Sequence, residues 1–99
     1  MGYEFYDMLL PRDIPRYRGR MPVLLHLGVP APDRETALRD TLALYGCADV
    51  YGEVLQAIDR GAGQLSKRPD GMKLKSIHKM VHVTEIKYEP SGVSQPVLF

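Results

Sequence analysis

Two histidines and a glutamate near the end of the chain have the spacing of a metal site. His78, His82 and Glu85 would share one face of a helix and could then bind zinc. On a β-strand, however, positions four apart are separated by about 13 Å, which is too far for two residues to bind one ion. Because β-branched residues are dense between Ser76 and Glu89, we favour a strand over the competing helix and predict no metal site.

The single cysteine is the other candidate for covalent chemistry. Cys47 lies between two predicted helices, just before the N-terminus of the second. A helix N-terminus can lower the pKa of a cysteine, as it does for nucleophilic cysteines. No histidine is near it in the sequence, so we interpret it as an ordinary buried cysteine. The sequence also lacks a phosphate-binding P-loop, a dinucleotide-binding glycine motif and a serine-nucleophile elbow. We therefore expect no catalytic residues, no cofactor and no enzyme activity.

An arginine-rich stretch, PRDIPRYRGRMP from Pro11 to Pro22, is the first candidate binding site. Arginine beside an aromatic ring suits phosphate pairing with base stacking, and arginine pairs equally well with carboxylates on a protein. The prolines and a glycine indicate an exposed connection, so a solvated, solubilising loop is the alternative. The candidate residues are Arg12, Arg16, Tyr17, Arg18 and Arg20.

A second basic group lies in the C-terminal third of the chain. The net charge of +1 hides an uneven distribution, because residues 31–60 carry six acids against three arginines. Residues 61–99 instead carry six lysines or arginines against three acids. Such a dipolar surface orients charged partners. We therefore add these residues to the predicted partner-binding set: Lys67, Arg68, Lys73, Lys75 and Lys79.

Size and composition are typical of one globular domain. The chain has 99 residues, of which 44% are hydrophobic and 25% are charged, close to the average for globular proteins. The longest run without charge, residues 21–32, is interrupted by prolines and is too short to cross a membrane. Acidic residues near the N-terminus do not fit a signal peptide, so we expect a cytoplasmic protein with no membrane contact.

Two strands are predicted at the start of the chain. YEFYDMLL, from Tyr3 to Leu10, is rich in aromatic and aliphatic residues and stops at a proline. MPVLLHLGV, from Met21 to Val29, is almost continuously apolar, as in a strand buried on both faces. We expect His26 within it to be a core or sheet-face residue rather than a metal ligand.

Two short helices should follow. The first begins at Pro32 or Asp33, either of which is a good helix-entry residue, and ends at Gly46. Asp49 can cap the second. The sequence RGAG, residues 60–63, ends the second helix. Apolar residues recur at helical spacing on one face of each helix: Ala37, Leu38, Leu42 and Tyr45 in the first, and Val50, Val54, Leu55 and Ile58 in the second.

The remaining elements complete an α+β fold. QLSK (64–67) and MKLKS (72–76) flank a turn, which predicts a small hairpin. The expected fold is a mostly antiparallel sheet of four to five strands, in the order strand, strand, helix, helix, strand, strand, covered on one face by the helix pair. Residues 1–90 should form this single domain, and residues 91–99 a flexible C-terminal tail.

Six tyrosines and segregated charge indicate an interaction protein. In size and format the chain resembles small stand-alone regulators and inhibitors, among them phage-encoded anti-CRISPRs. We predict a non-enzymatic binding protein that regulates or inhibits a macromolecular partner, with a protein partner favoured and a homodimer left open. The alternative is a nucleic-acid-binding regulator of winged-helix type, although the second helix begins with acidic and apolar residues, ADVYGEV.

Overall fold

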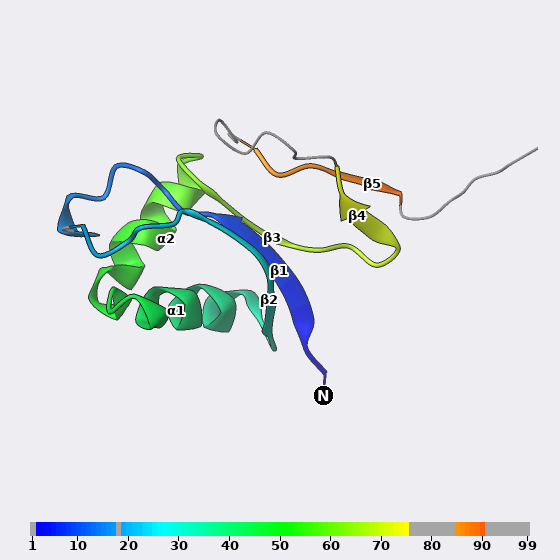
Figure 1. The fold of residues 1–99 in the computed structure, drawn as a ribbon, viewed down its shortest axis with the longest axis horizontal. Coiled ribbons are helices and arrows are strands. Elements are labelled where there is room, and N and C mark those ends of the chain that lie inside the picture. The colour runs from blue at the N-terminus through cyan, green and yellow to red at the C-terminus, as the bar shows by residue number, and fades with distance from the viewer. Residues whose placement is uncertain (1, 18, 76–84, 91–99) are drawn as a thin grey trace, which may run out of the picture.

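The computed structural model of this chain describes residues 2–17, 19–75 and 85–90. Figure 1 shows two helices packed beside a small sheet, with a separate pair of strands above it. The elements in chain order are β1 (Glu4–Leu9), the 3-10 turn η1 (Pro15–Tyr17), β2 (Leu25–Ala31), α1 (Arg34–Leu44), the 3-10 turn η2 (Ala48–Val50), α2 (Tyr51–Asp59), β3 (Gln64–Lys67), β4 (Met72–Leu74) and β5 (Tyr88–Pro90). This order confirms the α+β class and the helix pair.

The described strands form two antiparallel sheets rather than the single sheet of four to five strands expected from the sequence. β1 is the central strand of a three-stranded sheet with the order β2-β1-β3, and β4 pairs with β5. The predicted hairpin is therefore wrong, because Leu65 pairs with Met8 and Leu74 pairs with Tyr88. β3 pairs instead with the second edge of β1, and the pairing continues to Arg68, whose N–H donates to the Phe5 carbonyl oxygen at 2.7 Å.

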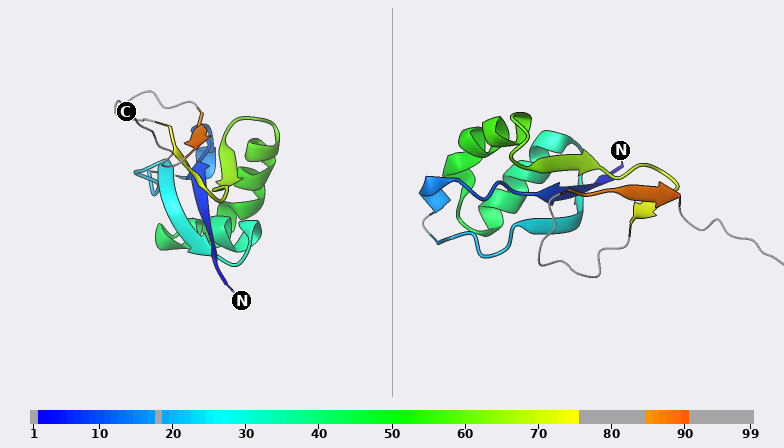
Figure 2. Two further views of the ribbon diagram at one scale, coloured as in Figure 1. Left: turned by 90° about the vertical axis from the view of Figure 1, so that its right-hand side faces the viewer. Right: turned by 90° about the horizontal axis from the view of Figure 1, so that it is seen from above.

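The hydrophobic core lies between the three-stranded sheet and the helices. Alternate residues of β1 and the residue after it, Tyr6, Met8 and Leu10, are buried on the helix side of the sheet. They belong to one cluster with Leu38 of α1 and Val54 of α2. The two views in Figure 2 place the helices on one side of this sheet and β4–β5 on the other. The predicted helix layer on one sheet face is confirmed.

The helix starts differ from each other in their caps. Asp33, one of the two predicted entry residues, is the N-cap of α1, and its carboxylate accepts a hydrogen bond of 2.8 Å from the Thr36 N–H. The prediction that Asp49 caps the second helix is wrong. Val50 is the N-cap residue of α2 and contributes no side-chain hydrogen bond, whereas Asp49 lies within η2. Its carboxylate instead accepts hydrogen bonds from two arginines of the connection after β1.

The strand β2 begins later than predicted and contains a bulge. It starts at Leu25 rather than Met21, and Leu27 is exposed, so the expectation of burial on both faces is wrong. The register passes from Tyr6 opposite Val29 to Met8 opposite His26, which leaves two residues of β2 opposite one residue of β1. Gly28 permits this bulge with a φ of 68°, in the region that favours glycine.

Several predictions lie partly or wholly outside the described residues. The strand predicted over residues 76–89 is described only from residue 85, and its last residues enter β5. His78, His82, Lys79 and the tail at 91–99 are not described. Within residues 2–17, 19–75 and 85–90, no helix is both long enough and apolar enough to span a membrane.

Candidate interaction surface

The arginines of the connection between β1 and β2 pair with acids of this same chain. Arg16 donates to Asp49 at 3.0 Å and to Glu53 at 2.6 Å. Arg20 also donates to Asp49, at 3.0 Å from Nη1 to Oδ1. These contacts tie the connection to the start of α2, so the two guanidinium groups neutralise an acidic helix end.

Arg20 makes more hydrogen bonds within the chain than Arg16 does. Its guanidinium also donates to the carbonyl oxygens of Arg16, Tyr17 and Gly46. The hydrogen bond between Arg20 and Asp49 raises the pKa of Arg20 and holds the pKa of Asp49 below its usual value. A guanidinium with this many internal acceptors has few donors left for a partner.

The other residues predicted in this stretch are placed differently. Tyr17 belongs to the hydrophobic core, and burial raises its pKa to about 12. Its hydroxyl has no hydrogen-bond partner among the described residues. Arg12 is exposed, and Arg18 is not described. The stretch therefore offers no exposed tyrosine on which a base could stack.

Asp7 is a buried carboxylate on the sheet face away from the helices. Arg68 donates to both of its oxygens, at 3.0 Å from Nε and 2.5 Å from Nη2. The N–H of Gly28, turned inward by the bulge, donates to Oδ1 at 2.8 Å. The Tyr88 hydroxyl donates to Oδ2 at 2.8 Å. One carboxylate thus joins β1, β2, β5 and the residue after β3.

The charge of Asp7 is stabilised despite its burial. Burial by itself would raise the pKa of Asp7, but the hydrogen bonds from Arg68, Gly28 and Tyr88 outweigh it, so the pKa lies below its usual value. Burial and the hydrogen bond to Asp7 both raise the pKa of Tyr88. Asp7 is therefore an anion that fixes β5 over the sheet, and Arg68, predicted as a partner-binding residue, is occupied in this internal pair.

A side-chain amide provides the second attachment of β4–β5 to the main sheet. Gln64 accepts from the Ile86 N–H at 2.8 Å and donates to the Ile86 carbonyl oxygen at 3.1 Å. This pattern copies a backbone ladder, with the amide in place of a peptide group. Ile86 is buried as a result. The two attachments hold one face of β4–β5 toward the sheet.

The opposite face of β4–β5 carries lysines. Lys73 lies opposite Glu89 in the register, and Lys75 donates its N–H to the carbonyl oxygen of Lys87. Because side chains alternate along a strand, these residues project away from the face that holds Tyr88. We call Lys73, Lys75 and Lys87 the lysine face. Two of them were predicted as binding residues, and Lys87 was missed because its pairing with Lys75 requires the fold.

Apolar side chains are exposed on the same side of the molecule. Phe5 shares the face of β1 that holds Asp7, Leu27 shares that face of β2, and Tyr3 stands just before β1, two residues from Phe5. Val23, just before β2, alternates with Leu24, which packs on the core. The exposed fractions are 68% for Tyr3, 52% for Phe5, 46% for Val23 and 36% for Leu27. We call these four residues the outer stripe.

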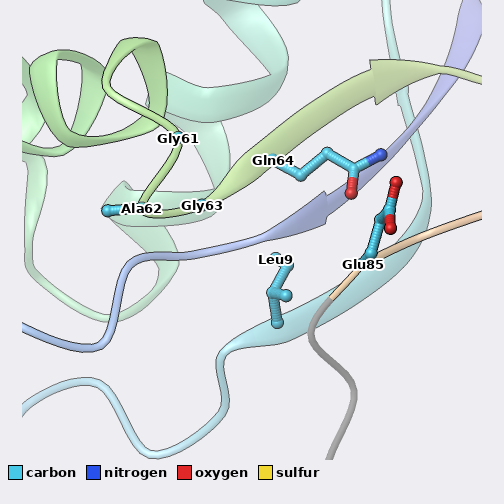
Figure 3. Close-up of a pocket in the computed structure, with 6 residues that line it drawn as sticks. All are labelled: Leu9, Gly61, Ala62, Gly63, Gln64 and Glu85. Atoms are coloured by element: carbon cyan, nitrogen blue, oxygen red, sulfur yellow. The ribbon is translucent and has the colours of Figure 1, made fainter.

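A shallow pocket of about 320 Å³ lies where α2 turns into β3. Figure 3 shows its lining of Leu9, Gly61, Ala62, Gly63, Gln64 and Glu85. Gly63 is required here because a Cβ at this position would lie 2.7 Å from the Leu9 carbonyl oxygen. The lining contains one carboxylate and one amide that is already bonded, so it assembles no nucleophile with a base.

The other residues considered for chemistry are structural where they are described. Cys47 is buried in the core, as predicted. The His26 ring lies against the Tyr45 ring, with centroids 5.5 Å apart, which confirms its place on the sheet face. In the part of the chain that the structure describes, no three His, Cys, Asp or Glu residues are grouped to hold a metal ion. Comparison with protein-family models, curated proteins and solved structures found no match to this chain.

Proposed function

We propose that this chain is a non-enzymatic binding protein that regulates or inhibits a macromolecular partner through protein–protein contacts, in the cytoplasm. The observation that carries the proposal is the outer stripe. Four large apolar side chains are exposed on one side of the sheet, whereas the chain buries its own core on the other side. Exposed apolar patches with a polar rim mark interaction sites, and tyrosine and phenylalanine are enriched there.

The positions of the basic residues modify the surface predicted from the sequence. Arg16, Arg20 and Arg68 pair with carboxylates of this same chain, so we assign them to the fold rather than to contact with a partner. The lysine face remains exposed, and Arg12, although exposed, belongs to the connection between β1 and β2 rather than to this face. We therefore assign partner contact to the side of the sheet away from the helices.

A nucleic-acid-binding regulator is the second candidate, because Tyr3 and Phe5 are exposed aromatic rings near lysines. For this candidate, binding of nucleic acid through a winged helix is less well supported than binding on the exposed face of the sheet. Asp49 and Glu53 stand at the start of α2, where a recognition helix would present donors to bases. The basic hairpin predicted after the helix pair, which would form the wing, does not form, because β3 and β4 pair with different strands.

Affinity purification from the native host, with and without nuclease, tests the proposed function. We expect one protein to be recovered at constant yield under both conditions and to bind the purified chain directly. Recovery that disappears after nuclease treatment would establish the nucleic-acid function instead. Binding to nucleic acid should also weaken steeply between low and physiological salt, because counterions are released on phosphate contact.

A further inference from the structure

The outer stripe is shaped for contact through side chains rather than for addition of a strand. β2 is an edge strand, but its bulge directs the Gly28 N–H to the Asp7 carboxylate instead of outward. Pro30 in the same strand has no N–H to offer. Bulges and prolines are devices that block edge pairing. These features disfavour addition of a partner strand at β2 and leave the face of the sheet beside it for side-chain contact.

The charges around the outer stripe discriminate between partner classes. A symmetric pair of copies would bring two lysine faces into one interface, and this like-charge contact is unfavourable. The lysine face has three lysines beside two glutamates, because Lys73 lies 3.8 Å from Glu89 and Lys87 lies 3.8 Å from Glu85. Its small net positive charge suits a segment with a few carboxylates better than a phosphate backbone, whose binding depends on many cations. Val23 and Leu27 are aliphatic and offer no ring for stacking. A protein segment that carries apolar side chains with carboxylates beside them complements both the outer stripe and the lysine face.

We propose that the outer stripe and the lysine face together bind an acidic, apolar segment of a partner protein. This inference rests on the proposed function and specifies its surface and the chemistry of its partner. Apolar side chains of the segment cover Phe5 and Leu27, and its carboxylates pair with Lys75 and Lys87. The apolar contact supplies affinity, and the lysines supply orientation and rate of association.

The test uses peptides selected from a random-sequence display library on the immobilised full-length protein. We expect the enriched peptides to carry net negative charge together with leucine, isoleucine or aromatic residues. Binding of one synthetic selected peptide is then measured by fluorescence anisotropy. Phe5→Thr and Tyr3→Thr, which place a residue of high strand propensity in or beside β1, should each weaken binding at least tenfold. The double change Lys75→Glu with Lys87→Glu should weaken it by a similar factor.

Two matched controls locate the effect on the surface. Leu44→Thr removes an even more exposed apolar residue at the end of α1 and should leave binding unchanged. The double change Arg12→Glu with Arg60→Glu alters the net charge as much as the double lysine change and should reduce affinity less than twofold. Circular dichroism and thermal melting confirm that each variant is folded; the Tyr3 variant, outside the strand, provides the test if Phe5→Thr does not fold.

Four results would overturn the inference. They are enrichment of basic or uncharged peptides, equal binding by wild-type protein and the stripe variants, equal weakening by the control charge pair, and tighter binding of a thymidine 30-mer than of the peptide. Capture of a host protein whose binding survives the stripe and lysine variants would retain the proposed function and reject this surface. If the wild-type chain captures no host protein at all, the proposed function itself is rejected.

Discussion

Asp7 places a charge on a strand whose other residues are mostly aromatic or aliphatic. The aspartate in YEFYDMLL was visible in the sequence, but its role was not, because Arg68 and Tyr88 are far from it along the chain. Sequence patterns predict which local element a residue joins, whereas an ion pair across 61 positions depends on the final topology. The pairs that Arg16 and Arg20 make with Asp49 were unpredictable for the same reason.

Replacing Asp7 by asparagine should destabilise the protein. The change leaves the Arg68 guanidinium, 30% exposed, without its counterion and leaves one acceptor oxygen in place of two. Breaking a buried ion pair costs about 3 kcal/mol, at the lower end of the usual range because Arg68 reaches solvent. Urea unfolding of the wild type and Asp7→Asn measures the difference. A loss below about 0.5 kcal/mol would show that the pair contributes little.

Acid should weaken the protein through the same residue. The pKa of Asp7 in the folded state is lowered, so its contribution to stability is present above the unfolded value of about 3.9. That contribution is lost as the pH falls from about 4 toward the folded-state pKa. We expect the unfolding free energy of the wild type to fall across this window more steeply than that of Asp7→Asn. Parallel pH profiles for the two proteins would contradict this assignment.

The arginines of the connection should differ in their effect on stability. Arg20→Ala removes contacts to Asp49 and to three carbonyl oxygens, so it should lower the melting temperature clearly. Arg12→Ala should change unfolding by no more than about 0.5 kcal/mol, as is usual for exposed residues. Thermal melting of both variants measures this contrast. Equal melting temperatures would mean that the Arg20 contacts are not formed in solution.

At the scale of elements, the sequence predicted what local patterns determine. The Asp33 entry residue and the apolar spacing of α1, together with the aromatic run of β1, identified two elements close to their observed bounds. Strand partners were not predictable, because a run such as QLSK pairs equally well with a neighbour or with a distant strand. The lysine face follows from such pairing, and so its third member, Lys87, was not found.

The bulge of β2 gives a prediction about glycine. Gly28→Ala forces a side chain into a φ of 68° and should cost about 1–2 kcal/mol, while disturbing the N–H that bonds to Asp7. Gly52 in α2 is the matched control, because it has open space around it and no positive φ. Gly52→Ala should stabilise the protein by about 0.5 kcal/mol through helix propensity. Chemical denaturation measures both, and a stabilising Gly28→Ala would contradict the bulge.

At the scale of the whole molecule, the three-stranded sheet separates two different surfaces. Its helix side is covered by α1 and α2. Its other side holds Asp7 with its hydrogen-bond donors, the strands β4 and β5, and the outer stripe. The sequence predicted a basic surface used for binding. Three of the predicted residues, Arg16, Arg20 and Arg68, instead pair with acids of this same chain. Composition indicates that a charge is present and does not indicate which acid lies beside it.

Hydrogen–deuterium exchange on the full chain, alone and in complex with the host protein that it captures, tests this division most directly. If the partner docks on the side of the sheet away from the helices, binding should slow exchange in Tyr3–Leu9, in residues 23–30 and in β4–β5. Residues 12–20 and α2 should exchange at the same rate in both states. Protection concentrated in the arginine-rich connection or along α2, with the sheet strands unchanged, would contradict the account.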